Sequence, residues 1–103
     1  MPLCKDWDDL NTNGQLGDWC FFEGSDRNTY IAFRYPHPDT KNYPPEYLET
    51  YRGEMSHVPV STGEKQASCW LWDGNRESPT ISPSIHIIGS WHGYIRNGKL
   101  ENA

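Results

Sequence analysis

Basic residues are scarce in this sequence, and long apolar runs are missing. Nine Lys and Arg residues stand against fourteen Asp and Glu residues, which gives a formal net charge of -5, and the basic residues form no run. Proteins that bind nucleic acids need clustered positive charge to neutralise phosphates. No apolar stretch approaches the roughly 20 residues that a membrane-spanning helix requires. We therefore expect neither a nucleic acid nor a membrane among the partners.

Cysteines are few and odd in number. The three are Cys4, Cys20 and Cys69, and this count argues against a disulfide framework and for reduced thiols. The first ten residues, MPLCKDWDDL, contain acidic side chains and no apolar segment of the kind that a secretory signal has. Both features predict an intracellular protein.

Aromatic residues, by contrast, are abundant. They make up 14% of the chain, whereas all hydrophobic residues together reach only 35%. With 103 residues the chain is expected to fold as a single domain with a small core. The five tryptophans can each bury roughly 150–250 Å², so this core must depend on a few large rings.

Alternating apolar and polar residues predict a mostly β fold. Residues 18–24 and 28–36 are expected to form a hairpin with Ile31, Phe33 and Tyr35 on its core side. Residues 68–74 and 80–88 are expected to form further strands, and Pro83 predicts an edge or a bulge in the second. Asn97-Gly98 is the preferred type I′ pair and predicts a hairpin over 91–102. We predict a single small antiparallel sheet, or a sandwich or barrel.

Two regions interrupt or precede this β pattern. Residues 1–17 are predicted to be a polar N-terminal arm, and residues 36–67 a Pro-rich insertion that carries one short helix beginning near Pro45. Residues 56–66 are expected to be loop with at most a short edge strand, because Pro59 has no N–H for a ladder. Residues 68–102 then form the β core.

Residues 70–100 also carry a specific motif. Trp70, Trp72 and Gly74 are followed by PTISPSI at 79–85, and then by His92, Tyr94, Ile95, Gly98, Lys99 and Leu100. This pattern resembles the signature of a family of small, largely uncharacterised proteins encoded by phages, prophages and bacterial operons. The resemblance implies a zinc site in many members, built from a Cys-Pro-x-Cys-like knuckle and a later Cys-His pair. Here the two positions read WCFFEG (19–24) and Trp91-His92, so most of those ligands are missing.

The remaining candidates for chemistry are Cys20, Cys69 and His92. A structural zinc needs four ligands, usually in closely spaced pairs, so we predict no cofactor and keep a zinc or small-ligand site at these residues as an alternative. A Cys-His enzyme is a further alternative, although a cysteine flanked by aromatic residues is more typical of a core. We therefore predict no catalytic residues and no enzyme, and we interpret PTISPSI as architecture.

The small size, the acidic balance and the resemblance together predict a phage-type binding protein. It would bind and inhibit a host protein through a basic surface on that partner, as an anti-defence, anti-CRISPR-like factor in the host cytoplasm. The predicted contact face combines acidic residues near the N-terminus with the tyrosine-rich insertion: Asp6, Asp8, Asp9, Asp18, Tyr43, Glu46, Tyr47, Glu49 and Tyr51.

Overall fold

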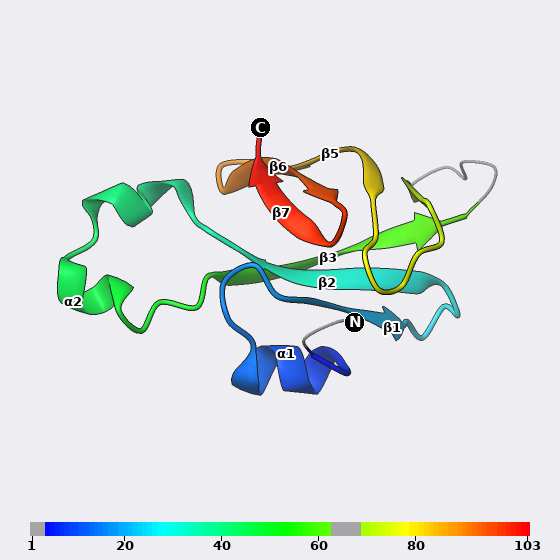
Figure 1. Ribbon diagram of the computed structural model, residues 1–103, viewed down its shortest axis with the longest axis horizontal. Helices are drawn as coiled ribbons and strands as arrows, with labels where there is room; N and C mark the ends of the chain where they lie inside the picture. Colours follow the sequence, from blue (N-terminus) through cyan, green and yellow to red (C-terminus); the bar gives the residue numbers. More distant parts are fainter. Residues whose placement is uncertain (1–3, 63–68) are drawn as a thin grey trace.

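A computed structural model of the protein describes residues 4–62 and 69–103. Within these residues the chain forms one seven-stranded sheet, whose strands lie side by side in chain order (Figure 1). The strands are β1 (Trp19–Glu23), β2 (Thr29–Tyr35), β3 (Glu54–Ser61), β4 (Trp70–Trp72), β5 (Ile81–Ile87), β6 (Trp91–Arg96) and β7 (Lys99–Asn102). Neighbouring strands are antiparallel except β3 and β4, which are parallel. The mostly β prediction is confirmed, with a mixed sheet rather than a purely antiparallel one.

The sheet curls so that its first and last strands face one another across the main core. Trp91 of β6 packs on Phe33 and Tyr35 of β2, with ring centroids 5.8 and 5.6 Å apart. The indole N–H of Trp19 in β1 donates to the carbonyl of Gly98, in the turn between β6 and β7, at 2.8 Å. Large rings therefore close the core, as the composition predicts.

The turns that the sequence predicts are present. Asn97 and Gly98 have φ angles of 51° and 74°, the positive values that a type I′ turn requires. The register of β5 against β6 shifts between Ile81 and Ile85, which confirms a bulge at Pro83. The hairpin of β1 and β2 is also confirmed, and Phe33 lies on its core side as expected.

The N-terminal segment corrects the prediction of a polar arm. Residues Trp7–Asn13 form helix α1, which covers the outer face of β1 and β2 (Figure 1). Asp6 caps the helix by accepting the N–H of Asp9 at 2.8 Å. Leu10 is fully buried against Cys20. None of the helices in residues 4–62 and 69–103 is long and apolar enough to cross a membrane.

A buried arginine fixes α1 to the rest of the fold. Arg34 of β2 is only 6% exposed, and its guanidinium donates to the carbonyls of Leu10 and Asn11 in α1 and of Arg52 and Gly53 before β3. Burial lowers the pKa of Arg34 from its ordinary value. The four carbonyls satisfy this desolvated group, as a buried charge requires.

The loop predicted over residues 56–66 is wrong up to Ser61, because these residues belong to strand β3. The strand pairs with β2 along its length, whereas β4 pairs with it only at Val60 and Ser61. Over most of its length β3 therefore has a single partner, like an edge strand, where Pro59 is tolerated. Residues 63–66 of the predicted loop lie outside the described residues.

Between β2 and β3 the chain leaves the sheet as an arm, residues 36–53, that extends the molecule to 44 Å (Figure 1). The arm contains a 3-10 helix, η1 (Pro38–Asn42), and the short helix α2 (Pro45–Leu48), so the predicted helix at Pro45 is confirmed. Its three tyrosines, Tyr43, Tyr47 and Tyr51, pack on one another with ring centroids 5.0 to 6.1 Å apart. The arm thus has a small aromatic cluster of its own.

Candidate active site

The outer face of β5 and β6 carries two neighbouring histidines. His86 and His92 are directly opposed across the two strands, both are exposed, and their ring centroids lie 5.0 Å apart. The residue before each histidine points inward: Ile85 and Trp91 are buried in the core. This alternation, with period two, turns the polar side chains away from the core.

Ser84 lies beside His92 on this face. The Oγ of Ser84 is 2.9 Å from the Nε2 of His92, a distance at which an imidazole can take the hydroxyl proton. Among the serines of residues 4–62 and 69–103, Ser84 is the one that lies within hydrogen-bond reach of a histidine. The pair has the spatial arrangement of a nucleophile and its general base.

The bulge in β5 determines where Ser84 lies. From Ile81 to Ile85 the chain advances four residues, while the paired positions on β6, Ile95 and Gly93, are only two apart. Two extra residues are therefore accommodated on β5, next to the cis Ser82-Pro83 peptide bond. Bulges of this kind re-aim a side chain at the edge of a ladder. Here the bulge contains the serine.

The main chain of Ser84 is held from the neighbouring strand. The indole N–H of Trp70 in β4 donates to the carbonyl of Ser84 at 3.3 Å, and the ring of Trp70 packs against the main core. Ile85 is buried directly after the serine. Contacts on both sides thus limit the movement of the backbone that carries the hydroxyl.

A cavity of about 480 Å³ opens beside His92. Its walls come from the first part of the arm and from the hairpin of β5 and β6, and its polar lining includes His37, Thr40, His86, Ser90, His92 and Asn102. Its volume lies within the range of about 300–1,000 Å³ that is usual for ligand sites. One member of the Ser84–His92 pair therefore faces a space that a substrate can enter.

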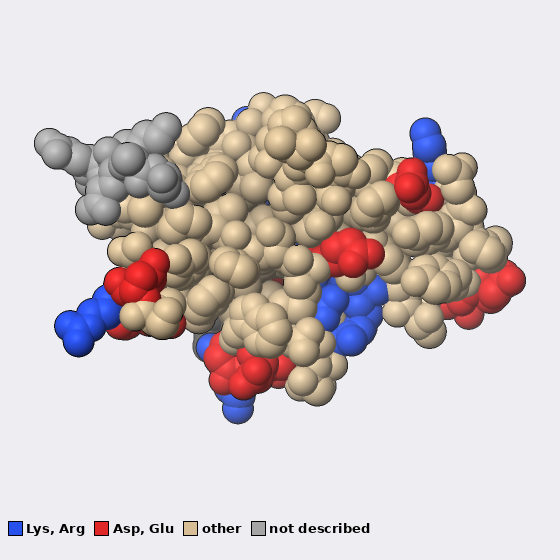
Figure 2. Space-filling model, turned by 180° about the vertical axis from the view of Figure 1, so that it is seen from behind, with Lys and Arg blue, Asp and Glu red and all other residues tan. Residues whose placement is uncertain are grey.

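The charged groups lie mostly away from the sheet. Figure 2 shows acidic side chains over α1 and over the arm, with basic side chains between them and a largely uncharged surface above α1 in this view. The first turn of α1 contributes Asp8 and Asp9 to this pattern. The visible face has no broad positive area that would attract phosphates.

The structure does not bring Cys20, Cys69 and His92 together. Cys20 is fully buried beneath α1, whereas His92 is exposed on β6. Burial raises the pKa of Cys20 to about 12, so its thiol stays protonated and is a poor nucleophile. Cys69 is buried as well. Within the described part of the chain, no three His, Cys, Asp or Glu side chains are close enough to hold a metal ion.

The residues of the predicted partner surface have different environments. Asp18 is only 9% exposed and accepts the N–H of Gln15 at 2.8 Å, so its burial removes it from any such surface. Asp6 and Asp9 take part in hydrogen bonds at the start of α1, while Asp8 is exposed. The remaining five residues lie on the arm: Tyr43, Glu46, Tyr47, Glu49 and Tyr51. Glu46, Tyr47 and Glu49 are exposed, whereas Tyr43 and Tyr51 are half-buried. That these residues bind a partner stays a prediction.

Comparison with protein families gives one match that includes Ser84, His86 and His92. The sequence model of BubE, the bacterial ubiquitination-like system serine protease, matches residues 51–103, slightly more than half of the chain. The chain belongs to the BubE family. Neither the comparison with curated proteins nor the comparison with solved structures gave a match. Because BubE is described as a serine protease, the prediction that the protein is not an enzyme is wrong.

Sequence reasoning identified His92 as a possible metal ligand or as the histidine of an alternative Cys-His enzyme, and it did not select Ser84 or His86. The sequence does contain a pattern that points to both residues: Ser84 and His86 alternate with the apolar Ile85 and Ile87. It places a hydroxyl and an imidazole on the outer face of one predicted strand, next to the strand that carries His92.

Proposed function

We propose that this BubE family member is a serine peptidase in which Ser84 is the nucleophile and His92 the general base. The observation that carries the proposal is the 2.9 Å contact between Ser84 Oγ and His92 Nε2. The description of the family as a bacterial ubiquitination-like system serine protease supports it. The substrate class that follows is a protein of such a system, cleaved at a peptide bond.

The reaction proceeds through an acyl-enzyme. Ser84 Oγ attacks the carbonyl carbon of the scissile bond while His92 Nε2 takes the hydroxyl proton, and the carbonyl oxygen becomes an oxyanion. His92 then gives this proton to the leaving nitrogen as the C–N bond breaks, which leaves an ester on Ser84. Water hydrolyses the ester after His92 has taken one of its protons, and the proton returns to Ser84 Oγ.

His86 supports the base by packing. For His92 Nε2 to accept the serine proton, the neutral ring must carry its own proton on Nδ1. The ring of His86, inclined by 41° to that of His92, limits rotation of the base about its side-chain bonds. A base that is held in one orientation needs less reorganisation when the serine reacts.

A fluorophosphonate probe tests the proposal directly. Such probes form a covalent bond with an activated serine, and we expect mass spectrometry to locate the adduct on Ser84. Ser84→Ala should abolish labelling and hydrolysis of a fluorogenic peptide library, and His92→Gln should lower both by about 10³-fold or more. Ser82→Ala, two residues away on an exposed position, is the matched control and should leave both intact. Full activity in Ser84→Ala would exclude this nucleophile.

Binding and inhibition of a host protein remains a second proposal, for a phage-type protein acting in the host cytoplasm. The observation in its favour is the exposed apolar surface of α2, where Tyr47 is 55% and Leu48 41% exposed. Tyr47→Ala should speed dissociation from a partner with a basic surface that is captured from host cells. Asp8→Lys should slow association at low salt. Unchanged binding kinetics in both folded variants would contradict this surface.

A further inference from the structure

The cavity beside His92 has a wall that the family match does not cover. The match begins at residue 51, whereas the arm contributes Pro36, His37, Pro38 and Thr40 to the lining. The rest of the lining comes from His92, the other residues of the hairpin of β5 and β6, and Asn102. The arm therefore adds groups of this chain's own to the space into which a substrate of Ser84 would pass.

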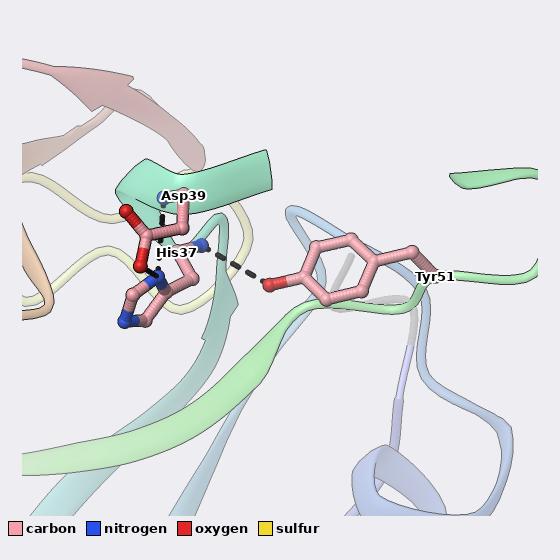
Figure 3. Close-up of polar contacts among 3 residues, drawn as sticks. All are labelled: His37, Asp39 and Tyr51. Carbon is pink, nitrogen blue, oxygen red and sulfur yellow. Dashed lines mark hydrogen bonds and ion pairs between the residues drawn. The ribbon is translucent and has the colours of Figure 1, made fainter. Parts of the chain in front are cut away.

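His37 has a defined orientation on this wall. Its Nδ1 accepts the backbone N–H of Asp39 at 3.1 Å, and its own backbone N–H donates to the hydroxyl oxygen of Tyr51 at 3.1 Å, as Figure 3 shows. Pro36 and Pro38 flank it and fix their own φ angles. The side chain is 25% exposed. Both the backbone and the ring of His37 are thus held by neighbours on the arm.

The hydrogen bond to Nδ1 also decides which nitrogen carries the proton. A neutral imidazole that accepts at Nδ1 must have its proton on Nε2. The contact with Asp39 uses Nδ1 and not Nε2. Because His37 lines the cavity, its Nε2–H can donate to an occupant of that cavity. A neutral donor suits a carbonyl oxygen.

The arm is built to keep this donor in place. The tyrosine cluster joins the two halves of the arm, with Tyr43 and Tyr51 ring centroids 5.6 Å apart. Arg34 holds the returning end of the arm by the carbonyls of Arg52 and Gly53, each at 3.2 Å. Burial within the cluster raises the pKa of Tyr51, so its hydroxyl remains a neutral partner for His37. The wall does not depend on the substrate for its shape.

The charges around the cavity favour an uncharged occupant. The carboxylate of Asp39 lies 3.7 Å from Nδ1 of His37, and the chain carries a net charge of -5. Both disfavour an anionic group at this position. A backbone carbonyl of an extended peptide accepts from the His37 Nε2–H without this electrostatic repulsion.

We propose that His37 is a substrate-binding residue that donates from Nε2 to a backbone carbonyl of the peptide substrate while Ser84 attacks the scissile bond. This inference rests on the proposed peptidase function. In this inference the arm forms a second wall of the substrate site. The contact of His37 strengthens binding of the substrate in the ground state. His37 has no part in the proton transfer between Ser84 and His92.

The test compares His37→Phe, which has no donor, with His37→Gln, whose amide N–H replaces Nε2–H. With the best fluorogenic tetrapeptide from a positional library, His37→Phe should raise KM about 3- to 10-fold, the effect of one lost hydrogen bond, at unchanged kcat. His37→Gln should restore most of the lost affinity. The rate of Ser84 labelling by a small fluorophosphonate should stay the same in both variants. His57→Phe, an exposed histidine that packs on Phe22 and Tyr30, is the control.

Three results would overturn the inference. One is an unchanged KM in His37→Phe, and another is a parallel loss of fluorophosphonate labelling, which would mean that His37 acts on Ser84 itself. The third comes from ¹⁵N–¹H spectra of the histidine rings in the unmodified protein, if they place the His37 proton on Nδ1. Failure of the peptidase proposal looks different, because wild-type protein would then show no labelling of Ser84 at all.

Discussion

Replacing Trp70 with Phe tests whether the backbone of Ser84 must be held for activity. The substitution keeps an aromatic ring against the core and removes the indole N–H that donates to the Ser84 carbonyl at 3.3 Å. One neutral hydrogen bond contributes about 1 kcal/mol. If that energy is used to position the serine, kcat/KM should fall about fivefold, since 1.36 kcal/mol corresponds to tenfold.

The matched control is Trp72→Phe in the same strand. The indole N–H of Trp72 donates to the carbonyl of Asn75 at 3.1 Å, so this variant loses a similar bond without touching Ser84. Both variants should lose about 1 kcal/mol of unfolding free energy, as urea denaturation measures. Only Trp70→Phe should lose activity, and its fluorophosphonate labelling rate should fall by the same factor.

The comparison of the two variants separates positioning from general loosening of the fold. Equal losses of kcat/KM in Trp70→Phe and Trp72→Phe would show that activity follows stability alone. Unchanged activity in Trp70→Phe, with the expected loss of stability, would show that the bulge holds Ser84 without help from β4. Either result refutes the positioning role of Trp70.

Two further predictions concern the fold. Gly98→Val should lower the unfolding free energy by about 1–3 kcal/mol, because φ there is 74° and a Cβ would lie 3.3 Å from Ser78 Cα; an unchanged Tm would contradict the turn. Cys20→Ala should make stability less sensitive to alkaline pH. Burial raises the pKa of Cys20 to about 12, whereas the thiol of the unfolded chain has the ordinary pKa of about 8.5. The contribution of Cys20 to the unfolding free energy is therefore fully present below about pH 8.5 and is lost as the pH rises toward 12, because only the unfolded chain loses the proton in that interval. Equal alkaline slopes in denaturation of the two proteins would argue against a buried thiol.

Features that depend on local backbone chemistry could be predicted from the sequence. The Asn97-Gly98 turn follows from two residues that tolerate positive φ. The bulge near Pro83 follows from a residue without an N–H to give to a ladder. In both cases a short segment contains the whole physical cause, and no distant contact is needed to decide the outcome.

Helix α1 and strand β3 depend on distant contacts and were not predicted. The buried apolar surface of α1 is mainly Leu10, which is too little for a helical periodicity to show. The helix is stabilised instead by Arg34, twenty-four positions further along. β3 owes its length to pairing with β2, and a proline within it concealed the strand.

The candidate site was missed because its geometry depends on strand register. An alternating pattern shows that Ser84 and His86 share a face, but it does not give the distance from either to His92. That distance is set by the shift of two residues between Ile81 and Ile85. A one-residue change of register would turn every side chain of a strand to the other face. The pairing of serine and base is therefore a tertiary property.

The exposure of the pair places a requirement on its substrate. His92 is exposed and Ser84 is only half-buried. The electrostatic stabilisation of a proton transfer increases when water is excluded from the site. The arm and the hairpin stand on either side of the cavity, and Ile88 at the tip of that hairpin is 88% exposed. A folded protein that covers both would remove water from His92 and bury this isoleucine. Under the proposed function, we expect a folded protein substrate to complete the site better than a small ester does.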